Sequence, residues 1–173
     1  LIIGGTGFLG PHLVRRAVAR GHVMTLFNRG RTNPGLFADL EKIQGDRKKD
    51  LAKLADRKWD AVIDTSAYVP KHVSALAEML APNVGHYVFV STCSVYSEMD
   101  TADTSEAPAV GKIDDEKTER VTEQSYGPLK ALCEQAAEKA MPGRVANIRP
   151  GLIVGPGDDS DRFSYWPIRI ASG

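Results

Sequence analysis

Apolar positions along this chain alternate between short continuous runs and longer stretches with helical spacing. The continuous runs end at glycine, asparagine, aspartate or serine, as buried strands do. They predict strands at residues 1–3, 22–27, 42–44, 59–64, 86–90 and 144–148. Helical spacing lies between the strands, and it predicts helices over 9–20, 48–55, 73–80 and from Tyr126 to Ala140.

Parallel strands need crossover connections, which are almost always right-handed and place helices on both faces of a sheet. The alternation of strands and helices therefore predicts an α/β fold with a doubly wound parallel sheet. Ligands bind such a sheet at the carboxyl ends of its strands. The residues that come directly after each predicted strand are thus the first candidates for a site.

The first predicted strand leads directly into a glycine-rich turn. Gly4, Gly7 and Gly10 are spaced three residues apart. Because glycine lacks a Cβ, the turn can take unusual backbone angles and a ligand can approach the main chain closely. The helix after the turn offers free N–H groups and the positive end of its dipole, which suit a pyrophosphate. The alternative is an ordinary glycine-rich turn, so the motif gains weight only from residues farther along the chain.

Composition is that of a globular α/β domain, with 173 residues, 42% of them hydrophobic and 25% charged. Because 22 Lys and Arg residues balance 22 Asp and Glu residues, no overall basic field argues for nucleic acid. The charges are not evenly distributed along the chain. Residues 97–124 hold nine acidic and three basic residues, a net charge of −6, so the rest of the chain has a net charge of +6. We expect this acidic segment to be a loop or a lid.

The cysteines and the ends of the chain bear on its surroundings. Cys93 and Cys133 lack the spacing of a metal site or a disulfide framework, which fits a reducing compartment. Because no apolar run is long enough to span a membrane, we expect a cytoplasmic protein without a metal site or membrane contact. Cys133 is predicted to be a core residue, and we expect Cys93 to pack rather than to act as a nucleophile. The chain begins with Leu1 in a strand that looks clipped, so we expect a fragment of something longer.

The residues after the second and third predicted strands bear on the choice of cofactor. An acidic residue after the second strand would bind the ribose hydroxyls of adenosine and repel a 2′-phosphate, but this position holds Asn28. Arg29 and Arg31 come next, and cations beside a neutral amide favour NADP(H) over NAD(H), unless both are solvated loop residues. Asp46 is either an acceptor for the adenine amino group or a turn residue, with Arg47 as a further candidate contact.

Tyr126 and Lys130 are four residues apart and share one face of the last predicted helix. A phenol has a reference pKa of about 10, so it is a poor acid or base at neutral pH. A nearby ammonium stabilises the phenolate and lowers that pKa, and it can also hold the ribose of a nicotinamide cofactor. Thr92 or Ser94, after the fifth strand, would hydrogen-bond a substrate oxygen. Pro128 is expected in the first helical turn, where proline is tolerated.

Four segments, in this order, resemble the short-chain dehydrogenase/reductases. They are GGTGFLG at 4–10, STCSVY at 91–96, YGPLK at 126–130 and RPGLIVGPGD at 149–158. The chain resembles the extended type or an atypical branch of it, the nucleotide-sugar epimerase/dehydratase-like proteins, over essentially its whole length. The resemblance implies a Rossmann-type NAD(P)-binding domain in a reductase or epimerase/dehydratase that acts on a small molecule.

The resemblance also implies residue roles. Tyr126 would be the acid/base and Lys130 its partner; Thr92, three positions before Val95, would be the catalytic hydroxyl, with Ser94 as the fallback. The implied cofactor contacts are Gly4, Gly7, Phe8, Leu9, Gly10, Asn28, Arg29, Asp46, Arg47 and Lys130.

The chain departs from the family pattern at the end of the fourth strand, where Asp64 stands in place of a His-Leu-Ala-Ala-like sequence. Asp64 is either a polar neighbour of the cofactor or a buried, hydrogen-bonded structural residue, and we favour the second. The acidic segment weighs against an anionic nucleotide-sugar as substrate.

The resemblance further predicts two regions. Residues 1–150 would be the NAD(P)-binding domain and 151–173 the start of a substrate-binding region that is mostly missing. In this tail, Arg162 is a candidate substrate residue, as are Tyr165 and Trp166 unless these aromatic rings are ordinary packing residues.

A second function stays open on the sequence alone. The short sequences Asn-Arg-Gly, Gly-Asp-Arg and Tyr-Gly-Pro-Leu-Lys also resemble those of atypical family members that are related to the chloroplast stem-loop RNA-binding proteins. A non-catalytic nucleotide-binding or RNA-binding protein on the same fold is therefore the alternative, and the neutral net charge with +6 outside residues 97–124 also motivates it, although the complete Thr-Tyr-Lys set argues against it. The sequence leaves the substrate and the oligomeric state undecided, with a homodimer as one alternative.

Overall fold

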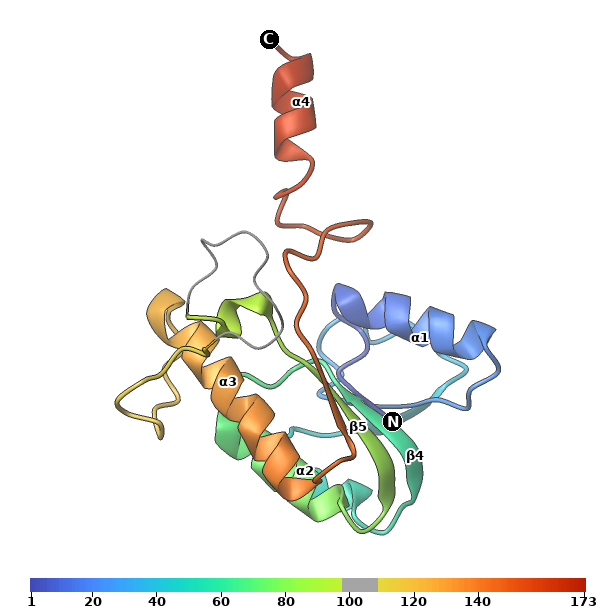
Figure 1. Cartoon of the computed structure of the whole chain (residues 1–173). Helices are drawn as coiled ribbons and strands as arrows, with labels where there is room; N and C mark the ends of the chain where they lie inside the picture. Colours follow the sequence, from blue (N-terminus) through green and yellow to red (C-terminus); the bar gives the residue numbers. More distant parts are fainter. Residues whose placement is uncertain (98–108) are drawn as a thin grey trace.

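A six-stranded parallel sheet forms the centre of the molecule (Figure 1). The structure is a computed structural model that describes residues 1–97 and 109–173. The strands are β1 (Ile2–Ile3), β2 (Thr25–Asn28), β3 (Glu41–Gln44), β4 (Trp59–Asp64), β5 (Val84–Val90) and β6 (Val145–Ile148). Their order is β3-β2-β1-β4-β5-β6, so the direction of winding reverses between β1 and β4. The predicted doubly wound parallel sheet is confirmed.

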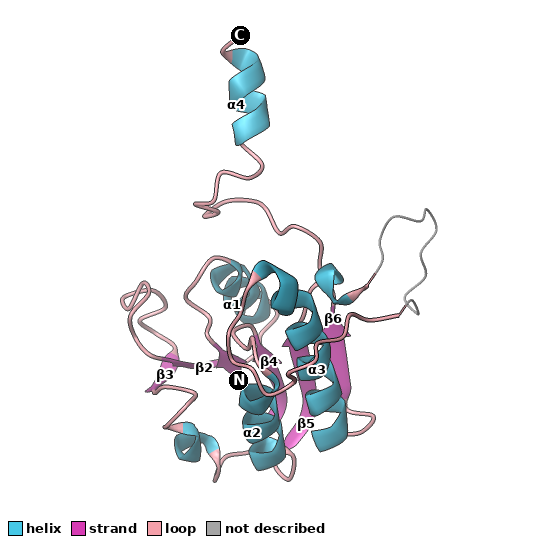
Figure 2. Cartoon of the chain, turned by 90° about the vertical axis from the view of Figure 1, so that its left-hand side faces the viewer, coloured by secondary structure: helices cyan, strands magenta, loops and turns pink. Residues whose placement is uncertain are grey.

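Helices cover both faces of this sheet (Figure 2). They are α1 (Leu9–Ala19), α2 (Pro70–Leu80), α3 (Glu123–Ala140) and α4 (Tyr165–Ala171), with short 3₁₀ turns η1 (Leu51–Leu54) and η2 (Cys93–Val95). α1 lies against one face, whereas α2 and α3 pack side by side on the other. A reversal point flanked in this way is where open α/β sheets bind ligands.

The core is split into two clusters by the alternation of side chains along the strands. Ile2 packs with Val14 of α1, whereas its neighbour Ile3 points to the opposite face and joins the larger cluster under α2 and α3. Tyr87 and Phe89 of β5 are the largest side chains in that second cluster besides Phe27. Cys133 is fully buried there, as predicted.

Three predicted boundaries are wrong for identifiable reasons. β2 begins at Thr25 rather than at residue 22, because Val23 is 97% exposed and makes no ladder with β1. The helix predicted over 48–55 is only the single turn η1. α3 starts at Glu123, before the predicted Tyr126, because Thr122 and Ser125 form a reciprocal capping box. Pro128 therefore lies inside the helix and not in its first turn.

The tail after β6 leads away from the sheet. α4 stands apart from the other helices in both views, and all its residues are exposed (Figures 1 and 2). The assignment of 1–150 and 151–173 to two regions stays a prediction. Part of the acidic segment, 98–108, lies outside the described residues; the rest is irregular apart from a bridge between Tyr96 and Val110. Within the described ranges, no helix is both long and apolar enough to cross a bilayer.

The glycine turn depends on close contact between two backbone segments. Gly5 has a φ of 90°, and a Cβ placed on Gly10 would lie 2.5 Å from the Gly5 carbonyl carbon. Gly10 is buried in the second position of α1, so the absence of its side chain lets the helix start directly against the turn. A Cβ on Gly7 would meet nothing within 4 Å.

We therefore expect Gly10→Ala to destabilise the protein more than Gly7→Ala. A methyl group on Gly10 would push α1 away from the turn, and overpacking of this kind costs about 1–3 kcal/mol. Gly7→Ala is the matched control and should cost less than about 1 kcal/mol. Urea unfolding of the full-length protein measures both, and equal losses would contradict the role assigned to Gly10.

Candidate functional site

A groove runs along the carboxyl edge of the sheet, across the reversal point. It consists of two hollows of about 330 and 370 Å³ that share Gly4, Gly7 and Ser66 in their walls. The first hollow extends over the ends of β2 and β3, where its lining includes Asn28, Arg29, Arg31, Asp46 and Arg47. The second extends over the ends of β4 and β5, and its lining includes Phe8, Leu9, Gly10, Tyr68, Ser91, Tyr126 and Lys130. The groove thus joins the glycine turn to both predicted ends of a dinucleotide site.

The start of α1 points into this groove without a side-chain cap. Phe8 occupies the N-cap position, its side chain accepts no hydrogen bond from the helix, and the first turn holds no acidic residue. The N–H groups of Leu9 and Gly10 therefore lack side-chain acceptors, and the positive end of the helix dipole is not neutralised locally. Gly7 leaves open space in front of them. The turn fits a bound anion such as a pyrophosphate.

Asn28 has its polar atoms engaged within the protein. Its Nδ2 donates to the Gly4 carbonyl oxygen at 2.9 Å, and its Oδ1 accepts from the Gly30 N–H at 2.9 Å. The side chain therefore ties the end of β2 to the glycine turn. Arg29 and Arg31 are exposed beside it, and within the described residues neither guanidinium forms a hydrogen bond or an ion pair.

Asp46 lies at the far wall of the first hollow. Its carboxylate accepts from the N–H of Lys48 at 2.9 Å, which lowers its pKa, with further lowering from the charge of Arg29. Asp46 is thus a turn residue that also borders the groove. Its role as an acceptor for the adenine amino group stays a prediction.

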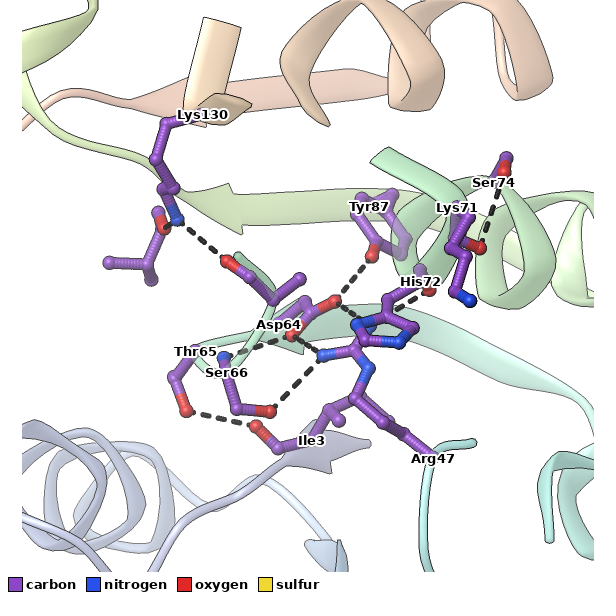
Figure 3. Close-up of polar contacts among 12 residues, drawn as sticks. Ile3, Arg47, Asp64, Thr65, Ser66, Lys71, His72, Ser74, Tyr87 and Lys130 are labelled. Atoms are coloured by element: carbon purple, nitrogen blue, oxygen red, sulfur yellow. Dashed lines mark hydrogen bonds and ion pairs between the residues drawn. The ribbon is translucent and has the colours of Figure 1, made fainter. Parts of the chain in front are cut away.

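Arg47 borders the first hollow and directs its guanidinium toward a buried carboxylate (Figure 3). Its Nη1 and Nη2 contact Asp64 Oδ1 and Oδ2 at 2.9 and 2.8 Å, and Asp64 also accepts from the Tyr87 hydroxyl at 2.8 Å. Burial alone would raise the pKa of Asp64, but the Arg47 guanidinium outweighs burial and holds that pKa below its usual value. Asp64 is fully buried, which confirms the structural interpretation of this residue.

Tyr126 and Thr92 come together because α3 packs closely on η2. Gly127 touches the Ser94 carbonyl oxygen, and any side chain at this position would collide with it. The Thr92 hydroxyl lies close enough to the Tyr126 phenol to lower its pKa, and it also contacts Ser94 Oγ at 3.2 Å. Thr92 is buried whereas Ser94 is exposed, so the structure brings the first of the two predicted hydroxyls to the phenol.

Lys130 is buried one helical turn beyond Tyr126. Its Nζ donates to the carbonyl oxygens of Val90 at 2.7 Å and Ala67 at 3.0 Å (Figure 3). It also lies 4.0 Å from the ring centroid of Phe89. Burial lowers the pKa of Lys130 to about 8. The two carbonyl contacts hold the ammonium group of Lys130 in a fixed position in the wall of the second hollow.

The expected effect of Lys130 on the phenol is absent from the structure. Burial raises the pKa of Tyr126, and the neighbouring Thr92 hydroxyl opposes that rise. The reason is geometric: the ammonium is directed at the ends of β4 and β5, while Tyr68 lies next to both residues. The Tyr68 ring centroid is 6.3 Å from that of Tyr126 and 5.6 Å from Lys130 Nζ.

Ser66, Tyr68 and Ser91 are among the groove residues that the sequence analysis missed. They come after strands β4 and β5, so their position at strand ends was the available signal. The buried hydroxyl of Ser91 has no hydrogen-bond partner within the described residues. Arg162, in contrast, lies in the exposed tail, and its contacts there are with Ser160 and Asp158.

Comparisons with known proteins agree with this geometry. Residues 1–173 match the NAD dependent epimerase/dehydratase family. The chain is similar to the chloroplast stem-loop binding protein of 41 kDa b from Arabidopsis thaliana, with 35% identity over 64% of this chain and 33% of the relative. It is also similar to the 2-alkyl-3-oxoalkanoate reductase of Stenotrophomonas maltophilia (strain K279a), with 32% identity over 91% of this chain and 52% of that protein.

Solved structures share the fold at lower identity. The UDP-glucuronic acid 4-epimerase from Bacillus cereus, in complex with NAD, superposes with a TM-score of 0.72 at 18% identity, over 92% of this chain and 59% of that one. The UDP-N-acetylglucosamine 4-epimerase from Methanobrevibacter ruminantium M1, in complex with UDP-N-acetylmuramic acid, gives 0.72 at 20% identity, over 95% and 57%.

The match over the whole chain and the identity to the reductase agree with the arrangement of the groove. The chain spans about half the length of that reductase and a third of the stem-loop binding protein. It belongs to the NAD dependent epimerase/dehydratase family.

Proposed function

We propose that this chain is the cofactor-binding and catalytic part of an NAD(P)-dependent oxidoreductase that acts on a carbonyl or hydroxyl group of a small molecule. One observation carries the proposal: Tyr126, with Thr92 beside it, shares a hollow with Lys130 and with the glycine turn. Reduction of a carbonyl is the better supported outcome, because the reductase relative is 32% identical over 91% of this chain. An epimerase or dehydratase is the related alternative within the family.

The groove fits a dinucleotide on structural grounds. The uncapped start of α1 and the open space at Gly7 suit the pyrophosphate, and the two hollows extend from there in opposite directions. Gly4, Gly7, Phe8, Leu9 and Gly10 would hold the centre of the molecule. When bound, a nicotinamide cofactor supplies or accepts a hydride.

The residues of the second hollow would move the proton. Tyr126 is protonated at neutral pH, since burial raises its pKa, so it can donate a proton to a carbonyl oxygen during reduction. Thr92 would hold the same oxygen and, by its hydrogen bond, stabilise the phenolate that remains. Lys130 would contribute positive charge beside the ribose. Tyr68 would cover the hollow from the side.

Replacement of Tyr126 by phenylalanine should lower kcat of the full-length protein by a factor of about 10²–10⁴, because the proton donor is lost. Binding of NADPH, followed by its fluorescence, should change little. Tyr68→Phe is the matched control, since it removes a second phenol from the same hollow. Turnover that is unchanged in Tyr126→Phe, measured with a panel of carbonyl substrates, would refute the proposed function.

We further propose that NADP(H) is preferred over NAD(H). The support is the exposed pair Arg29 and Arg31 at the first hollow, neither of which has a hydrogen-bond or ion-pair partner within the described ranges. Asn28 is neutral and is engaged with Gly4 and Gly30, so it would not repel a 2′-phosphate. Among the residues that the structure describes, Asp46 is the one acidic residue in the lining of this hollow.

Arg29→Ala should therefore weaken NADPH binding by about 10- to 100-fold, the value of a charge-assisted hydrogen bond, and leave NADH binding nearly unchanged. Arg20→Ala is the control, because Arg20 is exposed at the end of α1 and does not border this hollow. Titration of the full-length protein with both reduced cofactors measures the difference. Tighter binding of NADH than of NADPH to the unaltered protein would overturn the preference.

RNA binding is a second candidate, because the chain is 35% identical over 126 residues to a stem-loop binding protein. The Thr92-Tyr126 contact gives no reason for RNA binding, so we rank this candidate lower. A gel-shift titration with a stem-loop RNA at two salt concentrations distinguishes the two, since phosphate contacts weaken steeply with salt. We expect no salt-sensitive complex, and a tight one would favour the second candidate.

A further inference from the structure

The turn between β4 and α2 is held at both ends by Arg47, which comes from the loop after β3. Besides its two contacts with Asp64, Nη1 donates to Ser66 Oγ at 3.2 Å and Nη2 donates to the His72 carbonyl oxygen at 2.9 Å (Figure 3). Asp64 ends β4 and His72 lies in the first turn of α2. One guanidinium therefore fixes the start and the end of the 64–72 segment.

This segment forms part of the wall of the groove. Ser66 borders both hollows, and Tyr68 borders the second. Ala67, between them, is buried, and its carbonyl oxygen accepts from Lys130 Nζ at 3.0 Å. The backbone that Arg47 and Asp64 fix is thus the same backbone that locates the ammonium of Lys130.

The carboxylate of the ion pair has all its partners within the protein, whereas the buried Nε of Arg47 has no hydrogen-bond partner within the described residues. Asp64 accepts from Arg47 twice, from the Ser66 N–H at 3.0 Å and from the Tyr87 hydroxyl. A buried ion pair of this kind adds little net stability, because desolvation offsets the attraction, and well-packed apolar residues of similar volume often replace it without loss. An apolar pair could not supply the directional hydrogen bonds that Arg47 and Asp64 form with Ser66 and His72.

We infer that Arg47 and Asp64 are positioning residues that fix the Ala67 carbonyl and, through it, the ammonium of Lys130 in the wall of the second hollow. The inference rests on the proposed function for its catalytic consequence. Its structural part, the placement of Lys130, is independent of which reaction the full-length protein performs.

The double variant Arg47→Met with Asp64→Leu tests the inference in the full-length protein. We expect a melting temperature within a few degrees of the unaltered protein and a kcat lower by about 10- to 100-fold, as for residues that orient a catalytic group. Arg47→Lys should show a similar loss, because it keeps the charge but not the forked contacts. The control is Arg57→Met with Glu41→Leu, a pair with a 2.7 Å contact at the opposite end of the sheet, which should leave kcat unchanged.

A second readout needs neither cofactor nor substrate. The ¹³Cε NMR signal of Lys130, assigned by its loss in Lys130→Arg, should titrate near pH 8 in the unaltered protein. In the double variant its pKa should rise toward 10.5, because a mobile Ala67 carbonyl admits water to the ammonium. The direct charges of Asp64 and Arg47 act on Lys130 in opposite directions, so their joint removal largely cancels.

The outcomes separate the inference from the proposed function. A double variant with the kcat of the unaltered protein and an unshifted Lys130 titration would overturn the inference, and so would rescue of both by Arg47→Lys. If the double variant does not fold, Arg47→Lys gives the same two readouts with the charges at both positions retained. If the unaltered protein lacks NAD(P)H-dependent turnover, the proposed function fails, and the Lys130 titration still decides the inference.

Discussion

Parallel strands can be linked only by crossovers, and this constraint governs the molecule. Each strand returns to the same edge of the sheet, so residues from five separate parts of the sequence meet where the strands end. Between β1 and β4 the direction of winding reverses, so the helices that follow these two strands, α1 and α2, lie on opposite faces of the sheet. The glycine turn, the Asp64 turn and the Thr92 turn come after β1, β4 and β5, and they meet there because no other edge is available to them.

The sequence was sufficient for the type and order of the elements, and for much of the edge. Apolar periodicity locates β4 at its observed limits and α2 within a few residues, because these elements bury a continuous face. Apolar periodicity failed where other contacts determine the extent of an element. η1 is a single turn. The start of α3 is determined by a capping box of polar residues, which a pattern of apolar residues does not reveal.

The polar contacts of the site were less predictable, for a physical reason. Arg47 and Asp64 are 17 residues apart and Lys130 and Ala67 are 63 apart, so their pairing depends on the finished sheet rather than on local spacing. A motif indicates which residue types meet at the edge, but the direction of each side chain is determined by burial. Arg47, predicted as a cofactor contact, borders the first hollow and also pairs with a carboxylate whose pKa burial would otherwise raise.

The two carbonyl contacts of Lys130 limit what this residue can offer a ligand. An ammonium group carries three N–H bonds, and those to Val90 and Ala67 use two of them. One N–H remains for anything that enters the hollow, so a pair of vicinal hydroxyls can be held at two points only if one strand-end carbonyl gives up its bond. Two-point binding of a diol by Lys130 would therefore require the loss of one hydrogen bond to a backbone carbonyl at the end of β4 or β5.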